Sequence, residues 1–163
     1  MPDPGGAQAG ISLKQRLDQD MRNALKSKDS LRLGVLRMLK SEIRYKEIEK
    51  RADLSDDEVI SVLSSSVKKH KDSIEAFDKG GREDLVSREK AELEMIEAYL
   101  PEQLTEEELS GAIHQAIVEA NASGPADLGK VMRSVMLKVK GKAEGKLVTQ
   151  LVSSQLQSIS GPK

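Results

Sequence analysis

The stretch that decides the fold is LSDDEVISVLSSSVKKHKDSIEAFDKGG, residues 54–81. Ser55, followed three residues later by Glu58, forms a capping box, which is a sequence signature of a helix start. Across Val59–Phe77 apolar residues recur at spacings of three and four, the period of one helix face. The glycines at 80–81 favour a stop directly afterwards. The stretch therefore predicts one long amphipathic helix and points to an all-α protein.

The same signals recur on both sides of this helix. Ser12 with Gln15 and Thr105 with Glu108 form two more capping boxes, and apolar residues at helical spacing follow each of them. No alternating stretch is long enough to predict a strand. The further helices are predicted over residues 12–27, 30–50, 82–100, 105–117, 127–139 and 144–156, with Asp127 as a cap and Gly141 as a stop.

Pro101 is the predicted domain boundary, because proline interrupts the helix before it. The fold prediction is an N-terminal helical domain of about four helices followed by a small three-helix C-terminal bundle. The predicted ranges are a flexible leader at 1–11, the N-terminal domain at 12–100, the C-terminal domain at 101–157 and a flexible tail at 158–163.

Composition excludes several classes of site. The absence of Cys rules out disulfides, thiolate zinc sites and Cys nucleophiles. With one Phe, two Tyr and no Trp, the chain has no aromatic platform for stacking unpaired bases. No apolar run approaches the roughly 18 residues of a membrane span, and the start of the chain lacks the pattern of a signal peptide. We therefore expect a cytoplasmic protein with no membrane partner.

Charge is unevenly distributed, although the net charge is only −1. Residues 102–127 carry acidic side chains and no Lys or Arg, whereas residues 130–146 are strongly basic with Glu144 as the one acid. The C-terminal bundle is therefore expected to be dipolar, with an acidic first helix and a basic junction between its second and third helices. A second basic ridge is predicted on the helix over residues 30–50, formed by Arg37, Lys40, Arg44 and, just beyond it, Arg51.

The segment VMRSVMLKVKGKAEGKLVTQL, residues 131–151, allows three interpretations: a phosphate cradle, a surface for a polyanion, or only a turn between helices. A nucleotide P-loop is excluded, because that motif needs four residues between its glycines and a Ser or Thr after its Lys. Glycines would let a ligand backbone approach closely, and the start of the last helix would add amide donors for a phosphate. The alternative is an ordinary solvated face.

No catalytic constellation is apparent, and no metal or cofactor site is predicted. His70 falls on the apolar stripe of its helix and is interpreted as a packing or hydrogen-bonding residue. His114 has no partner arranged for chemistry. The acidic run Glu106–Glu108 is interpreted as a helix start that complements the helix dipole.

Three longer stretches resemble YqeY proteins, and the resemblance covers about Ser12 to Leu156 with matching order and spacing. Its most specific parts are AFDKGGREDLV, EAYLPEQL and the GKVM…KGKAEGK segment. The resemblance implies an all-helical, two-part protein. Its C-terminal region would be shared with the tail of the B subunit of the tRNA-dependent amidotransferase, and related tails are attached to some glutaminyl-tRNA synthetases.

Carried over by position, the family segment has Gly129, Val131 and Met132 in the penultimate helix, and Lys140, Gly141 and Gly145 at the turn. Many relatives have Asp where this chain has Glu144, and Asp is the better helix cap. The predicted RNA-binding residues, combining this segment with the basic residues around it, are Lys130, Arg133, Lys138, Lys140, Gly141, Lys142, Gly145 and Lys146. Arg37, Lys40 and Arg44 are the predicted secondary basic surface.

The resemblance implies a non-catalytic tRNA-binding accessory protein acting in translation. Two alternatives stay open. One is an auxiliary component of a carbon–nitrogen ligase with glutamine as amide donor, although the chain shows no nucleotide or amidase motif. The other is a protein-interaction module for an aminoacyl-tRNA synthetase or for amidotransferase subunits. The sequence leaves the particular tRNA and the oligomeric state undecided.

Overall fold

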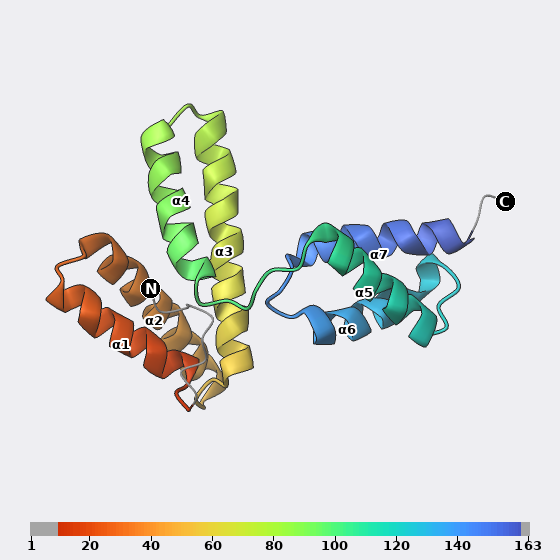
Figure 1. Ribbon diagram of the computed structural model, residues 1–163, viewed down its shortest axis with the longest axis horizontal. Coiled ribbons are helices and arrows are strands. Elements are labelled where there is room, and N and C mark those ends of the chain that lie inside the picture. Colours follow the sequence, from red (N-terminus) through yellow and green to blue (C-terminus); the bar gives the residue numbers. More distant parts are fainter. Residues whose placement is uncertain (1–9, 161–163) are drawn as a thin grey trace. The chain divides into compact units, whose positions relative to one another are not determined.

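The protein is all-α over the residues that the computed structural model describes, 10–160, and no strand occurs there (Figure 1). This confirms the predicted fold class. Most of the predicted leader, and residues 161–163 of the predicted tail, lie outside this range. None of the described helices has both the length and the apolar character needed to span a bilayer. The elements are α1 (Leu13–Lys26), α2 (Ser30–Lys50), α3 (Asp56–Lys79), α4 (Glu83–Glu97), α5 (Glu106–Glu119), the 3₁₀ turn η1 (Pro125–Asp127), α6 (Leu128–Val139) and α7 (Gly145–Ser160).

Contacts divide the chain into two compact units after Pro101. In unit 1, which precedes that point, α1 and α2 form one helical hairpin and α3 and α4 form another (Figure 1). Their apolar faces bury a common core that includes Leu17, Leu39, Leu63 and Ile96. Burying each such side chain contributes roughly 1.5–3 kcal/mol relative to leaving it exposed.

Unit 2 is a bundle in which each of α5, α6 and α7 packs against the other two. Its core is built of aliphatic side chains, with Val the most frequent. The fully buried members are Leu109, Ile113, Ala116, Val131, Val135, Val139, Val148, Val152 and Leu156. The helical periodicity of these residues in the sequence matches their burial.

All three predicted capping boxes are confirmed. Ser12, Ser55 and Thr105 each accept a hydrogen bond from the backbone N–H three residues later, and the side chain at that position bonds back to the cap. At the start of α3, hydrogen bonds from Lys50 and from the Ser55 backbone lower the pKa of Glu58 to about 2. These three helix starts were therefore predictable from the sequence.

Two helix ends differ from the prediction by three or more residues. α4 ends at Glu97 rather than Leu100, because a residue before proline disfavours the helical conformation; the Leu100 amide closes a final turn onto the Glu97 carbonyl at 3.0 Å. α7 continues to Ser160, whose hydroxyl donates to the Gln157 carbonyl at 2.9 Å. Residues 158–160 of the predicted tail are therefore helical.

Asp127 does not cap α6 with its side chain, contrary to the prediction. Its carboxylate instead accepts a hydrogen bond from the Ser123 backbone at 2.8 Å, and this bond lowers the pKa of Asp127 below its ordinary value. The 3₁₀ turn that begins at Pro125 leads directly into the helix. Asp127 therefore fixes the loop before α6.

Candidate nucleic-acid interface

The basic segment forms the junction between α6 and α7. α6 ends at Val139, Lys140 follows as its C-cap, and α7 begins at Gly145. Gly141 has a φ of 76°, in the left-handed region that glycine adopts without steric cost. Gly141 is therefore needed for the turn itself, in agreement with its predicted role as a stop.

The chain segment before α5 holds this turn in place through two hydrogen bonds. The Gln103 side chain donates to the Gly141 carbonyl at 2.7 Å, and the Leu104 amide donates to the Lys142 carbonyl at 2.8 Å. A third bond runs within the turn, from the Lys142 amide to the Val139 carbonyl at 2.8 Å. Two carbonyls of the turn are thus occupied from outside it, which fixes the backbone that carries the lysines.

Three predicted contact residues gather at this turn. Lys140, Lys142 and Lys146 are exposed, and none of them forms an ion pair with any residue in the described part of the chain. Lys146 lies in the first turn of α7, where backbone N–H groups have no partner within the helix and the dipole is positive. A Cβ added at Gly145 would meet nothing within 4 Å, so the start of α7 is open to solvent.

Lys138 is directed elsewhere. Its ammonium donates to the Glu119 carboxylate of α5 at 2.9 Å, and this bond lowers the pKa of Glu119. Both side chains are exposed to solvent, so the pair contributes little to stability. Lys138 could contact a phosphate only by exchanging this partner.

Lys130 and Arg133 lie on the outer face of α6, away from the turn. Both are exposed, and at 1.5 Å per residue Lys130 is roughly 15 Å along the helix axis from Lys140. Leu137 continues the same face, with 83% of its surface exposed. The eight predicted residues therefore divide into a turn cluster (Lys140, Gly141, Lys142, Gly145, Lys146), an outer pair on α6, and Lys138 beside α5.

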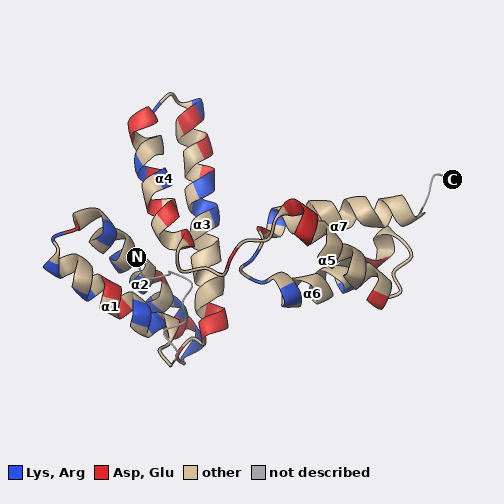
Figure 2. Cartoon of the chain, in the orientation of Figure 1, with Lys and Arg blue, Asp and Glu red and all other residues tan. Residues whose placement is uncertain are grey.

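Acidic side chains share the end of the bundle that carries the turn cluster. The hydrogen bond from Leu104 to Lys142 brings the start of α5 to the junction, and Figure 2 shows acidic residues there close to basic ones. Glu106, Glu107 and Glu108 are all exposed. The first helix is acidic and the junction is basic, as predicted. The predicted separation of these charges is wrong, however, because the acidic start of α5 lies at the same end of the bundle as the basic turn.

The predicted secondary basic surface on α2 is largely neutralised. Lys40 forms an ion pair with Asp18 of α1, and Arg44 lies 3.9 Å from Glu47. Arg37 is exposed with no ion pair within the described residues, and the chain leaves the helix at Arg51, which is left-handed with a φ of 61°. Two of the three residues predicted for this surface therefore already have a carboxylate partner.

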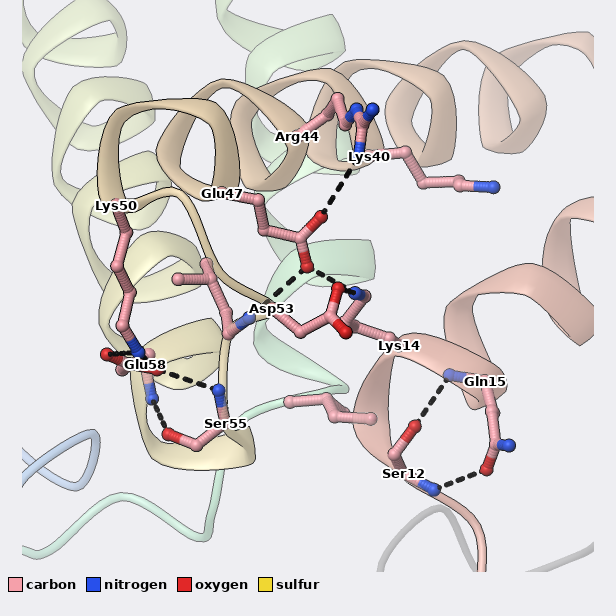
Figure 3. A network of polar contacts seen from close by, with 12 residues as sticks. Ser12, Lys14, Gln15, Lys40, Arg44, Glu47, Lys50, Asp53, Ser55 and Glu58 are labelled. Atoms are coloured by element: carbon pink, nitrogen blue, oxygen red, sulfur yellow. Dashed lines mark hydrogen bonds and ion pairs between the residues drawn. The ribbon is translucent and has the colours of Figure 1, made fainter.

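Glu47 is the centre of a polar network that the sequence did not predict (Figure 3). Its carboxylate is buried, pairs with Lys14 of α1 and accepts a hydrogen bond from the Leu54 amide at 3.3 Å. The bond from Lys14 lowers the pKa of Glu47 below its ordinary value. The network joins α1, the end of α2 and the start of α3, so its role is to hold unit 1 together.

The family is shown by comparison with known proteins. A family model described as "Yqey-like protein" matches residues 14–156. This chain belongs to the YqeY family. The resemblance seen in the sequence is therefore confirmed over both units of this YqeY protein.

Curated relatives of this YqeY protein include fungal proteins named "Altered inheritance of mitochondria protein 41, mitochondrial". One from Pyrenophora tritici-repentis is 31% identical, with 91% of this chain and 81% of the relative aligned. One from Kluyveromyces lactis is 32% identical, with 88% and 81% aligned. One from Lachancea thermotolerans is 33% identical, with 74% and 66% aligned. These names contradict the predicted cytoplasmic localisation, which is therefore wrong by this comparison.

The two histidines of this YqeY protein differ in their surroundings. His70 is buried and hydrogen-bonded on both ring nitrogens, which confirms its interpretation as a hydrogen-bonding residue. It does not stand alone, however, because two glutamates of α4 face it. Their spacing in the sequence could not reveal this, since the contact depends on how α4 folds back along α3. His114 is exposed on α5.

Proposed function

We propose that this YqeY protein is a non-catalytic tRNA-binding accessory protein whose turn cluster contacts phosphates of folded tRNA. The observation that carries the proposal is a set of three exposed lysines that have no ion-pair partner among residues 10–160. They lie at a turn held by hydrogen bonds from Gln103 and Leu104. A fixed backbone lowers the entropy lost when a ligand binds. Folded RNA is recognised largely through shape, phosphates and 2′-hydroxyls, which suits a surface that has lysines and no aromatic residues.

The amide donors at the start of α7 add to the same surface. An anion near this helix end would gain from the dipole as well as from Lys146. Lys130 and Arg133 would extend the footprint along α6 if the RNA follows that helix. Glu106–Glu108 oppose binding, so the orientation of the RNA on this end of the bundle is restricted.

The test is binding of the purified protein to bulk tRNA, to individual tRNAs and to an RNA duplex of similar length across a salt series. We compare the wild type with a Lys140→Ala, Lys142→Ala, Lys146→Ala triple variant. We expect saturable binding that is stronger for tRNA, and a salt slope that falls by about three in the variant. The matched control replaces three exposed lysines of unit 1, Lys26, Lys68 and Lys90, with Ala. This control has the same net charge as the turn variant and should bind tRNA like the wild type.

Unaltered binding by the turn variant would refute the proposal, as would equal weakening in both triple variants. Equally weak binding to tRNA and to the RNA duplex would show that the surface binds RNA nonspecifically. Co-purification of an aminoacyl-tRNA synthetase or amidotransferase subunit that survives nuclease would favour the interaction-module alternative. Glutamine-dependent amide transfer by the purified chain would favour the ligase alternative.

A further inference from the structure

A second cluster with chemical potential lies between α3 and α4 of unit 1, outside the proposed RNA surface. Nε2 of His70 is 3.1 Å from Oε2 of Glu92 and 3.7 Å from Oε2 of Glu89. The ligand atoms of all three residues lie within 4.8 Å of one another. Two carboxylates and an imidazole thus converge from two neighbouring helices.

The hydrogen bonds of His70 determine which of its ring nitrogens carries the proton, and they leave Nε2 facing the carboxylates. Nδ1 lies 2.8 Å from the Ser66 carbonyl, which can only accept, so Nδ1 carries the proton. In a neutral imidazole Nε2 then has a lone pair, and it faces a carboxylate that also offers only lone pairs. A positive species between these acceptors, either a proton on Nε2 or a metal ion, resolves the repulsion.

The distances suit a metal ion. Zinc bonds to imidazole nitrogen and carboxylate oxygen are about 2.0–2.2 Å long, which places the ligand atoms of a tetrahedral site roughly 3.4 Å apart. The separations of 3.1 and 3.7 Å fall on either side of this value. The two carboxylates lie within 4.8 Å of each other, so they would have to move closer together to complete the coordination.

The surrounding contacts also match those of a metal site. Ligating histidines commonly donate their other N–H to a carbonyl or carboxylate, which fixes ring orientation and tautomer; the Ser66 carbonyl does this for His70. Arg88 donates to Oε1 of Glu92 at 3.4 Å and leaves Oε2 for the site. Ser66, one turn earlier on the same helix, has a buried hydroxyl without a hydrogen-bond partner among the described residues.

We propose that His70, Glu89 and Glu92 form a three-ligand site for a divalent transition-metal ion such as Zn²⁺, joining α3 to α4. The imidazole and carboxylate ligand types suit Zn²⁺ and related ions. The imidazole is nearly fully buried, while the carboxylate side chains are 23% and 15% exposed, so an ion can enter from the solvent side. Three protein ligands leave a fourth position for water.

The first experiment is a titration of chelator-treated, untagged full-length protein with Zn²⁺ by calorimetry, repeated with Co²⁺ by absorption. We expect one ion per chain and at least tenfold weaker binding in His70→Gln, Glu89→Gln and Glu92→Gln. Arg88→Ala should weaken binding less, since it removes only an orienting contact. His114→Ala is the matched control, because it removes the other histidine of the chain, and its affinity should be unchanged.

A second measurement uses the wild type alone, so it does not depend on how the variants fold. Zn²⁺ should shift the ¹⁵N resonance of His70 Nε2 and leave that of His114 unchanged, and it should slow amide exchange in α3 and α4. No bound ion, or wild-type affinity in His70→Gln, would overturn the proposal. The cluster would then be a hydrogen-bonded imidazolium–carboxylate pair only.

Discussion

Replacing Gly141 with Ala tests whether the turn cluster depends on a left-handed residue. The φ of 76° at Gly141 places a Cβ in the region that L-residues disfavour by roughly 1–2 kcal/mol. A glycine-to-alanine change also stabilises a protein by about 0.4–1 kcal/mol, because it reduces the entropy of the unfolded chain. The measured destabilisation would therefore underestimate the strain unless this second effect is removed.

Gly145→Ala is the reference variant that cancels the unfolded-state effect. Gly145 begins α7 without a positive φ, and its added Cβ would meet nothing within 4 Å. Both variants gain the same unfolded-state term, so their difference should equal the strain at Gly141, about 1–2 kcal/mol. For a unit of this size each kcal/mol corresponds to about 4–8 °C in Tm.

Amide hydrogen exchange on peptides covering residues 128–160 is the suitable assay. Every Tyr and Phe of the chain lies in unit 1, so aromatic signals would not report on unit 2. We expect faster exchange across α6 and α7 in Gly141→Ala than in Gly145→Ala, with unchanged exchange in unit 1. Equal exchange in the two variants would refute the left-handed turn and, with it, the fixed geometry on which the RNA proposal depends.

Three further changes have defined outcomes. The pKa of Glu58, about 2, lies below its ordinary value of 4.5. The stability that the ionised carboxylate contributes is therefore complete above pH 4.5 and is lost as the pH falls towards 2. In denaturation experiments at several pH values, the unfolding free energy of Glu58→Gln should approach that of the wild type in that window. Tyr99→Phe removes the hydrogen bond to the Asp20 carboxylate and should lower unfolding free energy by about 1.5 kcal/mol, and an unchanged denaturant midpoint would contradict this. Glu106→Gln with Glu107→Gln should strengthen tRNA binding at low salt by up to about fourfold. A carboxylate and a phosphate about 10 Å apart in water interact by about 0.4 kcal/mol before screening, and the variant removes two carboxylates. The gain should vanish at high salt.

The helices and their starts were predictable because their signals are local. Each capping box pairs residues three positions apart, and the side chains of a helix face repeat with the helical period. The structure confirms Ser12, Ser55 and Thr105 as caps for this reason. Asp127 does not act as a side-chain cap, because its carboxylate accepts a hydrogen bond from the Ser123 amide instead.

The contacts that define both candidate sites were not predictable, because they join residues far apart in the sequence. Gln103 and Gly141 are hydrogen-bonded although α5 and α6 separate them in the sequence. Glu92 reaches His70 only because α4 folds back on α3. A basic segment can be recognised in a sequence, but its ion pairs depend on the neighbours that folding supplies, as the pairing of Lys138 with Glu119 illustrates.

The arrangement of charge at the α6–α7 junction bears on what kind of polyanion could bind there. A surface that attracted nucleic acid by net charge alone would gain from more lysines and fewer glutamates, but α5 begins with exposed acids beside the turn cluster. Phosphates can approach the lysines favourably only from directions that keep them away from Glu106–Glu108. If the proposed function holds, such a surface would discriminate between RNAs by the path of the backbone. A folded tRNA presents its phosphates along a bent path and a duplex along a straight one, so the duplex control tests whether the proposed surface discriminates between the two.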